Sequence, residues 1–246
     1  MRNIKFSVQF DGTRYLGWQR LKDSDNTIQG KLEDVLSKMT GEKISVIGCS
    51  RTDKGVHAKS LVSNFHTKTD MKIEEIQKYM NYYLPEDISV TYVDEAADKF
   101  HSRYNAKSKM YRYTIDNNTY PDVFTRKIAA HIPDALDIKA MEKAAEYLIG
   151  LHDFEAFTTM KSKTKGYERN IHSISITKKN NYVYIDFEGD GFLHNMIRIL
   201  TGTLVRVGKK ELSPADFAAM LESKDRSITG PVAPSKGLML MQVNFS

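Results

Sequence analysis

The stretch EKISVIGCSRTDKGVHAKSLVSNFHT, Glu42–Thr67, holds two apolar strand patterns separated by a charged loop. Glu42–Ser50 and Ser60–Thr67 each have the composition of a β-strand. Between them, an arginine, an aspartate, a lysine and a histidine fall within the seven residues Arg51–His57. An ordinary strand exit carries turn residues rather than so many ionisable groups. We therefore take the two strands as the centre of the fold and the loop as a candidate functional site.

The neighbouring segments place these strands in a β-α-β-β-α-β order. Asn3–Phe10 alternates apolar and polar residues, and Asp87–Ala96 is a further strand pattern. Thr27 is a helix N-cap before the apolar stripe of Ile28–Met39, and Ile73–Leu84 is a second helix. This order predicts a ferredoxin-like unit, in which helices cover one face of an antiparallel sheet and the other face stays open for a ligand.

The second half of the chain follows this order only loosely. Its strand patterns are Met110–Asp116, Arg126–Ile132, Asn170–Lys179, Asn181–Gly189 and Gly237–Phe245. Helices are expected at Ile138–Gly150, at Gly191–Gly208 and after Pro214. A polar stretch at residues 101–109 marks the boundary, so we predict an α+β protein with two ferredoxin-like (RRM-like) domains, 1–105 and 106–246. We expect their antiparallel sheets to join into one extended sheet, with an active-site cleft between the domains.

Composition narrows the class of protein. The chain has 246 residues, of which 41% are hydrophobic and 27% charged, as in soluble globular proteins. The net charge of +5 is a mild basic bias that favours polyanionic partners. Cys49 is the only cysteine, which excludes an internal disulfide and a cysteine-based zinc site. No membrane-length apolar run and no signal peptide stand out, so we expect a cytoplasmic protein.

Several common catalytic motifs are missing from the sequence. There is no GxxxxGK[ST] phosphate loop, no GxGxxG after a strand, no HExxH zinc motif and no GxSxG nucleophile elbow. The usual nucleotide, dinucleotide and zinc classes therefore lack their defining residues. We expect neither a cofactor nor a catalytic metal.

Arg51 and Asp53 are spaced so that both side chains project from the same face of an extended backbone. A carboxylate in that place serves as a nucleophile, a general base or a metal ligand, and a neighbouring cation keeps it ionised. Gly55 permits a sharp turn after it. From this loop alone, an ordinary salt-bridged turn is the competing interpretation.

The loop GCSRTDKGVHA, Gly48–Ala58, resembles the signature of the tRNA pseudouridine synthase A (TruA-type) family. Further segments resemble the family in the same order along nearly the whole chain. They are FDGTRYLGWQR (10–20), TIQGKLEDVL (27–36), FHSRYNAKSKMYRYTI (100–115), GFLHNMIRILTGTLVRVG (191–208) and APSKGLML (233–240).

The resemblance implies an isomerase that converts uridine to pseudouridine at positions 38, 39 and 40 of the tRNA anticodon stem-loop. Asp53 matches the family's essential aspartate. Attack at C1′, attack at C6 and abstraction of the 2′ proton all need an ionised carboxylate, and the sequence leaves these routes open. The family forms homodimers and uses tRNA as its partner. Which uridines, which tRNAs and which other RNAs are used cannot be decided from the sequence.

Other family positions map onto this sequence. Tyr111 matches the active-site tyrosine that stacks on the target base, and Tyr113 competes with it because it has the same strand parity. Arg51 matches an arginine linked to flipping the nucleotide, and Arg198 one that pairs with the catalytic aspartate. Four further residues are expected to support the site or contact RNA: Lys54, His57, His194 and Asn195.

The main rival function is a non-catalytic, RRM-like RNA-binding protein, which also uses aromatic residues on an open sheet. A binding protein gains nothing from Asp53, because a carboxylate repels phosphate. A metal-dependent nuclease would need several carboxylates, and no acidic cluster accompanies Asp53 in the chain. The basic run Lys161, Lys163 and Lys165 is an additional candidate for tRNA contact.

Overall fold

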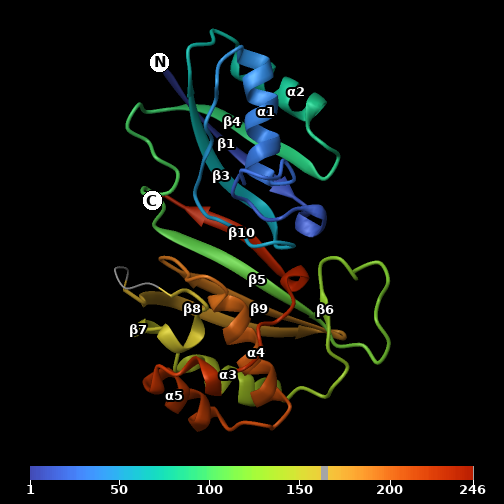
Figure 1. Cartoon of the computed structure of the whole chain (residues 1–246). Helices are drawn as coiled ribbons and strands as arrows, with labels where there is room; N and C mark the ends of the chain where they lie inside the picture. The colour runs from blue at the N-terminus through green and yellow to red at the C-terminus, as the bar shows by residue number, and fades with distance from the viewer. Residues whose placement is uncertain (162–165, 246) are drawn as a thin grey trace. The chain divides into compact units, whose positions relative to one another are not determined.

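A computed structural model describes residues 1–161 and 166–245. The chain divides into two compact units (Figure 1). The first unit comprises Met1–Lys107 together with Met239–Ser246, and the second comprises Ser108–Leu238. The division lies close to the predicted boundary, but the last strand belongs with the first unit rather than with the second half of the chain.

The first unit is a sheet covered by two helices. Its strands are β1 (Arg2–Phe10), β2 (Ile47–Gly48), β3 (His57–Thr67), β4 (Ile88–Ala96) and β10 (Leu238–Asn244). Antiparallel pairing gives the order β4-β1-β3, and both β2 and β10 pair with the remaining edge of β3. Helices α1 (Ile28–Thr40) and α2 (Ile73–Tyr83) lie on the same face of this sheet (Figure 1).

Local sequence explains these elements. On β1, Ile4, Phe6 and Val8 are fully buried, as their alternation predicts. Thr27 caps α1 by accepting a hydrogen bond from the Gly30 N–H at 3.2 Å. Gly41, with φ of 70°, ends the same helix. The hydrophobic pattern locates β1 in the sequence, and the caps mark the two ends of α1.

The second unit has its own sheet, in the order β5-β9-β8-β7, with neighbouring strands antiparallel. Its strands are β5 (Ser108–Asp116), β6 (Ala130–His131), β7 (Gly150–Asp153), β8 (Glu168–Lys179) and β9 (Tyr182–Gly189). Three helices contact one another: α3 (Ile138–Glu146), α4 (Met196–Gly208) and α5 (Pro214–Ser223). Short 3₁₀ turns occur at Gly12–Arg14 (η1), Glu155–Phe157 (η2), Arg226–Ile228 (η3) and Ser235–Gly237 (η4).

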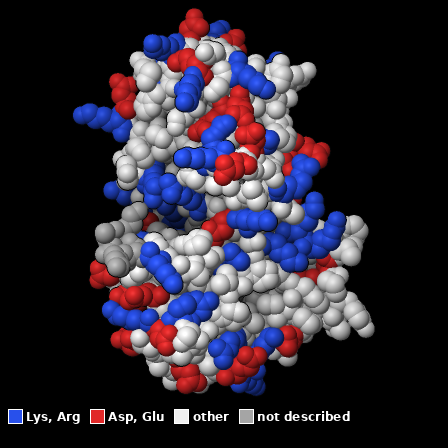
Figure 2. Space-filling view, viewed as in Figure 1, with Lys and Arg blue, Asp and Glu red and all other residues white. Residues whose placement is uncertain are grey.

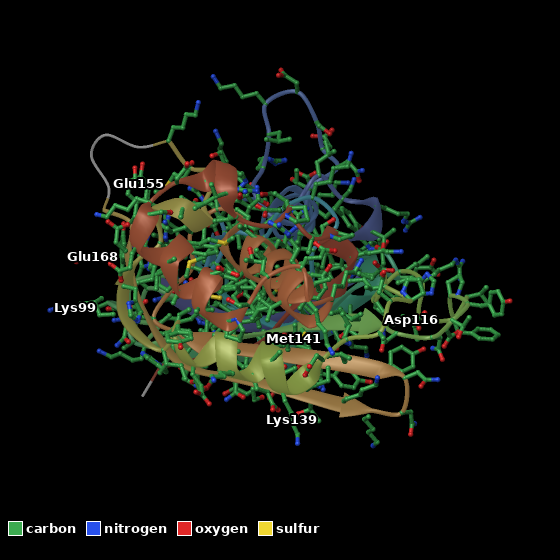
Figure 3. The ribbon with its side chains drawn as sticks, turned by 90° about the horizontal axis from the view of Figure 1, so that it is seen from below. Lys99, Asp116, Lys139, Met141, Glu155 and Glu168 are labelled. Atoms are coloured by element: carbon green, nitrogen blue, oxygen red, sulfur yellow. The ribbon has the colours of Figure 1, made fainter. Side chains whose placement is uncertain are left out.

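Figure 3 shows two buried residues of this unit, Met141 on α3 and Asp116 at the end of β5. Asp116 accepts hydrogen bonds from the Asn118 N–H (3.1 Å), the Asn118 side-chain amide (2.6 Å) and the Asp122 N–H (2.8 Å). These bonds shape the loop that follows β5. Burial raises the pKa of Asp116, but the three hydrogen bonds together with the charge of His131 more than offset this effect, so that the pKa is lowered.

Some predicted strands are shorter in the structure. β2 covers only Ile47–Gly48 because the preceding backbone bonds to α1 instead of to a strand: the Val46 N–H donates to the Glu33 carboxylate, and the Val46 carbonyl accepts from the Gln29 side chain. β6 covers only Ala130–His131, because the Ile128 and Ala129 N–H groups donate to the Thr125 carbonyl in a turn.

The ends of two predicted helices also differ. α3 ends at Glu146, and Gly150, with φ of 105°, begins the unpredicted strand β7 instead of ending the helix. α4 begins at Met196 because Asn195 adopts φ of 60°, which is incompatible with a helix running through it.

The predicted α+β class with ferredoxin-like arrangements is confirmed. The first unit has the full β-α-β-β-α-β order, and the second unit has β5-α3-β8-β9-α4 with the sheet order β5-β9-β8. The expectation that the sheets join and enclose a cleft stays a prediction, as does the division of functional residues between domains 1–105 and 106–246.

Candidate active site

Asp53 lies on the turn that connects β2 to β3. The Cys49 N–H donates to the Val62 carbonyl at 2.9 Å and extends the strand pairing by one residue. The chain then turns, and the Val56 N–H donates to the Asp53 carbonyl at 3.1 Å. Gly55 takes φ of 77°, the turn conformation that favours glycine. The Asp53 carboxylate is thus half-buried just before β3, while Arg51 and Lys54 on either side are exposed.

A second loop, residues 11–27, holds the Asp53 turn in place. The Trp18 N–H donates to the Thr52 carbonyl at 3.0 Å, and the Trp18 carbonyl accepts from the Gln29 N–H of α1 at 2.9 Å. The Trp18 ring is buried. Gly17 has φ of 107°, and a Cβ there would lie 2.7 Å from the Thr52 carbonyl oxygen. The backbone next to Asp53 is therefore fixed by direct contact with Gly17 and Trp18.

His57 holds the same loop from the start of β3. The Gly12 N–H donates to His57 Nδ1 at 3.1 Å, so this nitrogen is an acceptor and the ring proton lies on Nε2. Asp11 Oδ1 also lies 3.2 Å from Nδ1. The same Asp11 oxygen accepts a hydrogen bond from the Thr13 N–H at 2.9 Å. Because His57 is only 1% exposed, its position fits support of the loop better than contact with RNA.

The two candidate tyrosines of β5 have different surroundings. Tyr113 is fully buried, and its hydroxyl donates to the Pro234 carbonyl at 2.8 Å. Burial raises the pKa of Tyr113, an effect that the nearby Arg198 cation partly opposes. Tyr111 is buried with its ring edge-to-face against Phe192, at a centroid distance of 5.5 Å. Tyr113 therefore has a structural task, and the assignment of Tyr111 as the tyrosine that meets a substrate stays a prediction.

Arg198 is held on the first turn of α4 by backbone and side-chain contacts. Its Nε donates to the Ala233 carbonyl at 2.7 Å, and the Ala233 N–H donates back to the Arg198 carbonyl at 3.1 Å. Its Nη1 donates to Asn195 Oδ1 at 2.8 Å. His194 is exposed, whereas Asn195 and Arg198 are half-buried. The sequence pattern did not reveal Ala233, which lies 35 residues beyond Arg198 in the chain.

Comparison with known proteins identifies the family. A family model described as tRNA pseudouridine synthase matches residues 6–105 and 144–246, which is more than half of the chain. The chain belongs to the tRNA pseudouridine synthase family. Asp53 and Arg198 fall within the matched segments of this synthase, and Tyr111 falls between them. The predicted family and the predicted isomerase class are confirmed.

Curated relatives of the synthase match over its full length. It is 45% identical to tRNA pseudouridine synthase A 2 of Bacillus cereus strain ZK / E33L over 245 residues, which covers 100% of both chains. It is 49% identical to tRNA pseudouridine synthase A of Bacillus sp. strain KSM-64, and 48% identical to tRNA pseudouridine synthase A 1 of Clostridium tetani strain Massachusetts / E88. Both of these matches also cover 100% of each chain.

The predicted site residues of the synthase occur in two groups. Arg51, Asp53, Lys54 and His57 belong to the first unit, and Tyr111, His194, Asn195 and Arg198 belong to the second. Within residues 1–161 and 166–245, no group of three or more histidine, cysteine, aspartate or glutamate side chains is arranged to hold a metal ion. In the same part of the chain, no helix is long and apolar enough to span a membrane.

The surface of the synthase carries charges of both signs. Figure 2 shows lysine and arginine side chains at many places on the visible face, interspersed with aspartate and glutamate. Such cations are suited to contact with RNA phosphates. Of the predicted basic run, Lys161 is exposed, while Lys163 and Lys165 lie outside the described residues.

Proposed function

We propose that this synthase isomerises uridine to pseudouridine at positions 38, 39 and 40 in the tRNA anticodon stem-loop. The observation that carries the proposal is the placement of Asp53 on a turn fixed by the Trp18 and Val56 backbone hydrogen bonds. A non-catalytic RNA-binding protein has no use for a carboxylate held in this way. Membership of a synthase family supports catalysis over simple binding.

The proposed reaction breaks the N1–C1′ bond, turns the uracil and forms a C5–C1′ bond. C5 loses its proton to solvent and N1 gains one, so substrate and product are isomers. Asp53 acts as nucleophile or base through its ionised carboxylate. The routes through C1′, through C6 and through the 2′ proton all agree with a half-buried carboxylate on a fixed turn.

Other residues have supporting tasks in this proposal. Tyr111 stacks on the extruded base, because an aromatic ring offers a flat apolar face to an unstacked uracil. Arg51, which is exposed beside Asp53, holds the phosphates while the nucleotide is flipped out of the stem. The pairing of Arg198 with the Asp53 carboxylate stays a prediction. So do the homodimer, the cytoplasmic location and the RNA-contact roles of Lys54 and His194.

A tritium-release assay tests the proposal. Unmodified tRNA labelled at uridine C5 is incubated with wild type and with Asp53→Asn, and tRNA binding is measured in parallel. We expect release by wild type alone, with binding retained by both proteins. Binding by wild type to a range of tRNAs without any release would overturn the proposal and favour the RNA-binding alternative. Loss of activity on adding a chelator to folded enzyme would contradict a metal-free reaction.

A further inference from the structure

Side chains around the start of α4 form a hydrogen-bonded series that ends at Arg198. Arg198 Nη1 donates to Asn195 Oδ1 at 2.8 Å, and Asn195 Nδ2 donates to Thr159 Oγ1 at 2.8 Å. Thr159 Oγ1 in turn lies 2.7 Å from His194 Nδ1. Thr159 follows η2 and lies 36 residues before Asn195, so two distant segments meet here.

The direction of this series is fixed by chemistry. A guanidinium group only donates hydrogen bonds, so the amide of Asn195 must turn its oxygen toward Arg198. The amide nitrogen then points to Thr159, whose hydroxyl oxygen accepts the bond. An amide with its oxygen and nitrogen exchanged would face the guanidinium donor with a second donor. Each member of the series therefore orients the next.

Asn195 occupies an unusual position for its task. Asparagine at a helix N-cap ordinarily has extended backbone and accepts a hydrogen bond from an N–H of the first turn. Here Asn195 has φ of 60°, and its side chain makes no capping bond. Asparagine is one of the few residues that tolerate this backbone conformation. Its side chain forms hydrogen bonds with Arg198 and Thr159 instead of with the N–H groups at the helix end.

We propose that Asn195 and Thr159 are positioning residues that hold the Arg198 guanidinium in the orientation needed for isomerisation. The inference rests on the proposed function, in which Arg198 serves the catalytic carboxylate. With Nε bonded to Ala233 and Nη1 bonded to Asn195, two edges of the guanidinium plane are set. Loss of the Asn195 bond removes the contact that sets the Nη1 edge.

The test compares variants that each remove the side-chain contacts of one member of the series and keep the backbone. Thr159→Val removes the hydroxyl at an exposed site while keeping the side-chain shape, and Thr159→Ser restores the hydroxyl. Asn195→Gly removes the amide and accepts φ of 60° without steric cost. Thr177→Val is the matched control, a threonine exposed on β8. Turnover (kcat), tRNA dissociation constant and thermal unfolding are measured for each.

We expect Thr159→Val and Asn195→Gly to lower kcat by roughly tenfold, a part of the about 100-fold loss that a 1 Å misplacement causes. Binding of tRNA and thermal stability should change little, and Thr159→Ser should recover most of the turnover. A merely structural role would lower the unfolding temperature and leave kcat unchanged, which would overturn the inference.

A double-mutant cycle with Arg198→Lys separates this inference from the proposed function. If Thr159 acts through Arg198, Thr159→Val should have no further effect on kcat in the Arg198→Lys protein. If Thr159→Val lowered kcat by the same factor in the Arg198→Lys protein as in wild type, the positioning role would be overturned, while the proposed catalytic function would stand. Wild-type turnover by Arg198→Lys alone would instead refute the proposed role of Arg198 itself.

Discussion

Gly17→Ala should slow the enzyme by moving the backbone beside Asp53. An alanine at φ of 107° costs about 1–3 kcal/mol of backbone strain. Its Cβ would also lie 2.7 Å from the Thr52 carbonyl oxygen. Relief to an ordinary C···O contact of about 3.3–3.6 Å requires a shift of roughly 0.6–0.9 Å. Because a 1 Å misplacement costs about 100-fold, we expect kcat to fall roughly 10–100-fold.

The control for this prediction is Gly41→Ala. Gly41 also has positive φ, 70°, but no atom lies within 4 Å of the Cβ that alanine would add. The Gly41→Ala variant therefore has backbone strain of about 1–2 kcal/mol but no steric clash. Tritium release measured at saturating tRNA separates the two effects. Equal kcat values for the two variants would show that contact with Thr52 does not position Asp53, and our reasoning would fail.

Three further substitutions test the second unit. Tyr113→Phe leaves the Pro234 carbonyl without its hydroxyl donor, so the free energy of unfolding measured in urea should fall by about 1–3 kcal/mol, with little change in turnover. Tyr111→Ala should lower turnover. If Tyr113→Phe lowered turnover and Tyr111→Ala did not, the roles of the two tyrosines would be exchanged. Asp116 has a lowered pKa, so its contribution to stability is present above about pH 4 and is lost as pH falls through the folded value. Asp116→Asn should therefore be less stable at neutral pH and should lack this acid-dependent loss, and identical pH profiles for both proteins would contradict the assignment.

The sequence predicted those elements whose hydrophobic pattern or helix cap can be recognised over a few neighbouring residues. Ile4, Phe6 and Val8 alternate, and Thr27 caps α1 within three residues of itself, so pattern alone located β1 and α1. The predicted strand was longer than the observed β2. The Val46 N–H donates to the Glu33 carboxylate, 13 residues away in the chain, and local strand propensity contains no information about this contact. Distant side chains, not local preference, set the ends of such a strand.

The same distinction holds at the candidate site. The Asp53 loop was visible in the sequence because its ionisable residues are adjacent in the chain. The contacts of Thr159 with Asn195 and of Ala233 with Arg198 join segments about 35 residues apart, and a single sequence has no signal for them. Tyr111 and Tyr113 lie on the same face of one strand, so the alternation of side chains could not decide which of them is the active-site tyrosine. The Pro234 contact of Tyr113 distinguishes them.

The location of β10 has a consequence for how this protein is made. Met239 and Leu240 pair with His57 and Ala58 at the start of β3, immediately after the Asp53 turn. Residues 1–107 leave the ribosome well before this strand does, by on the order of ten seconds at common rates of synthesis. Until then, β3 lacks its last partner on the edge nearest the Asp53 turn. The edge of β3 beside this turn is therefore completed only after the whole second unit has been synthesised.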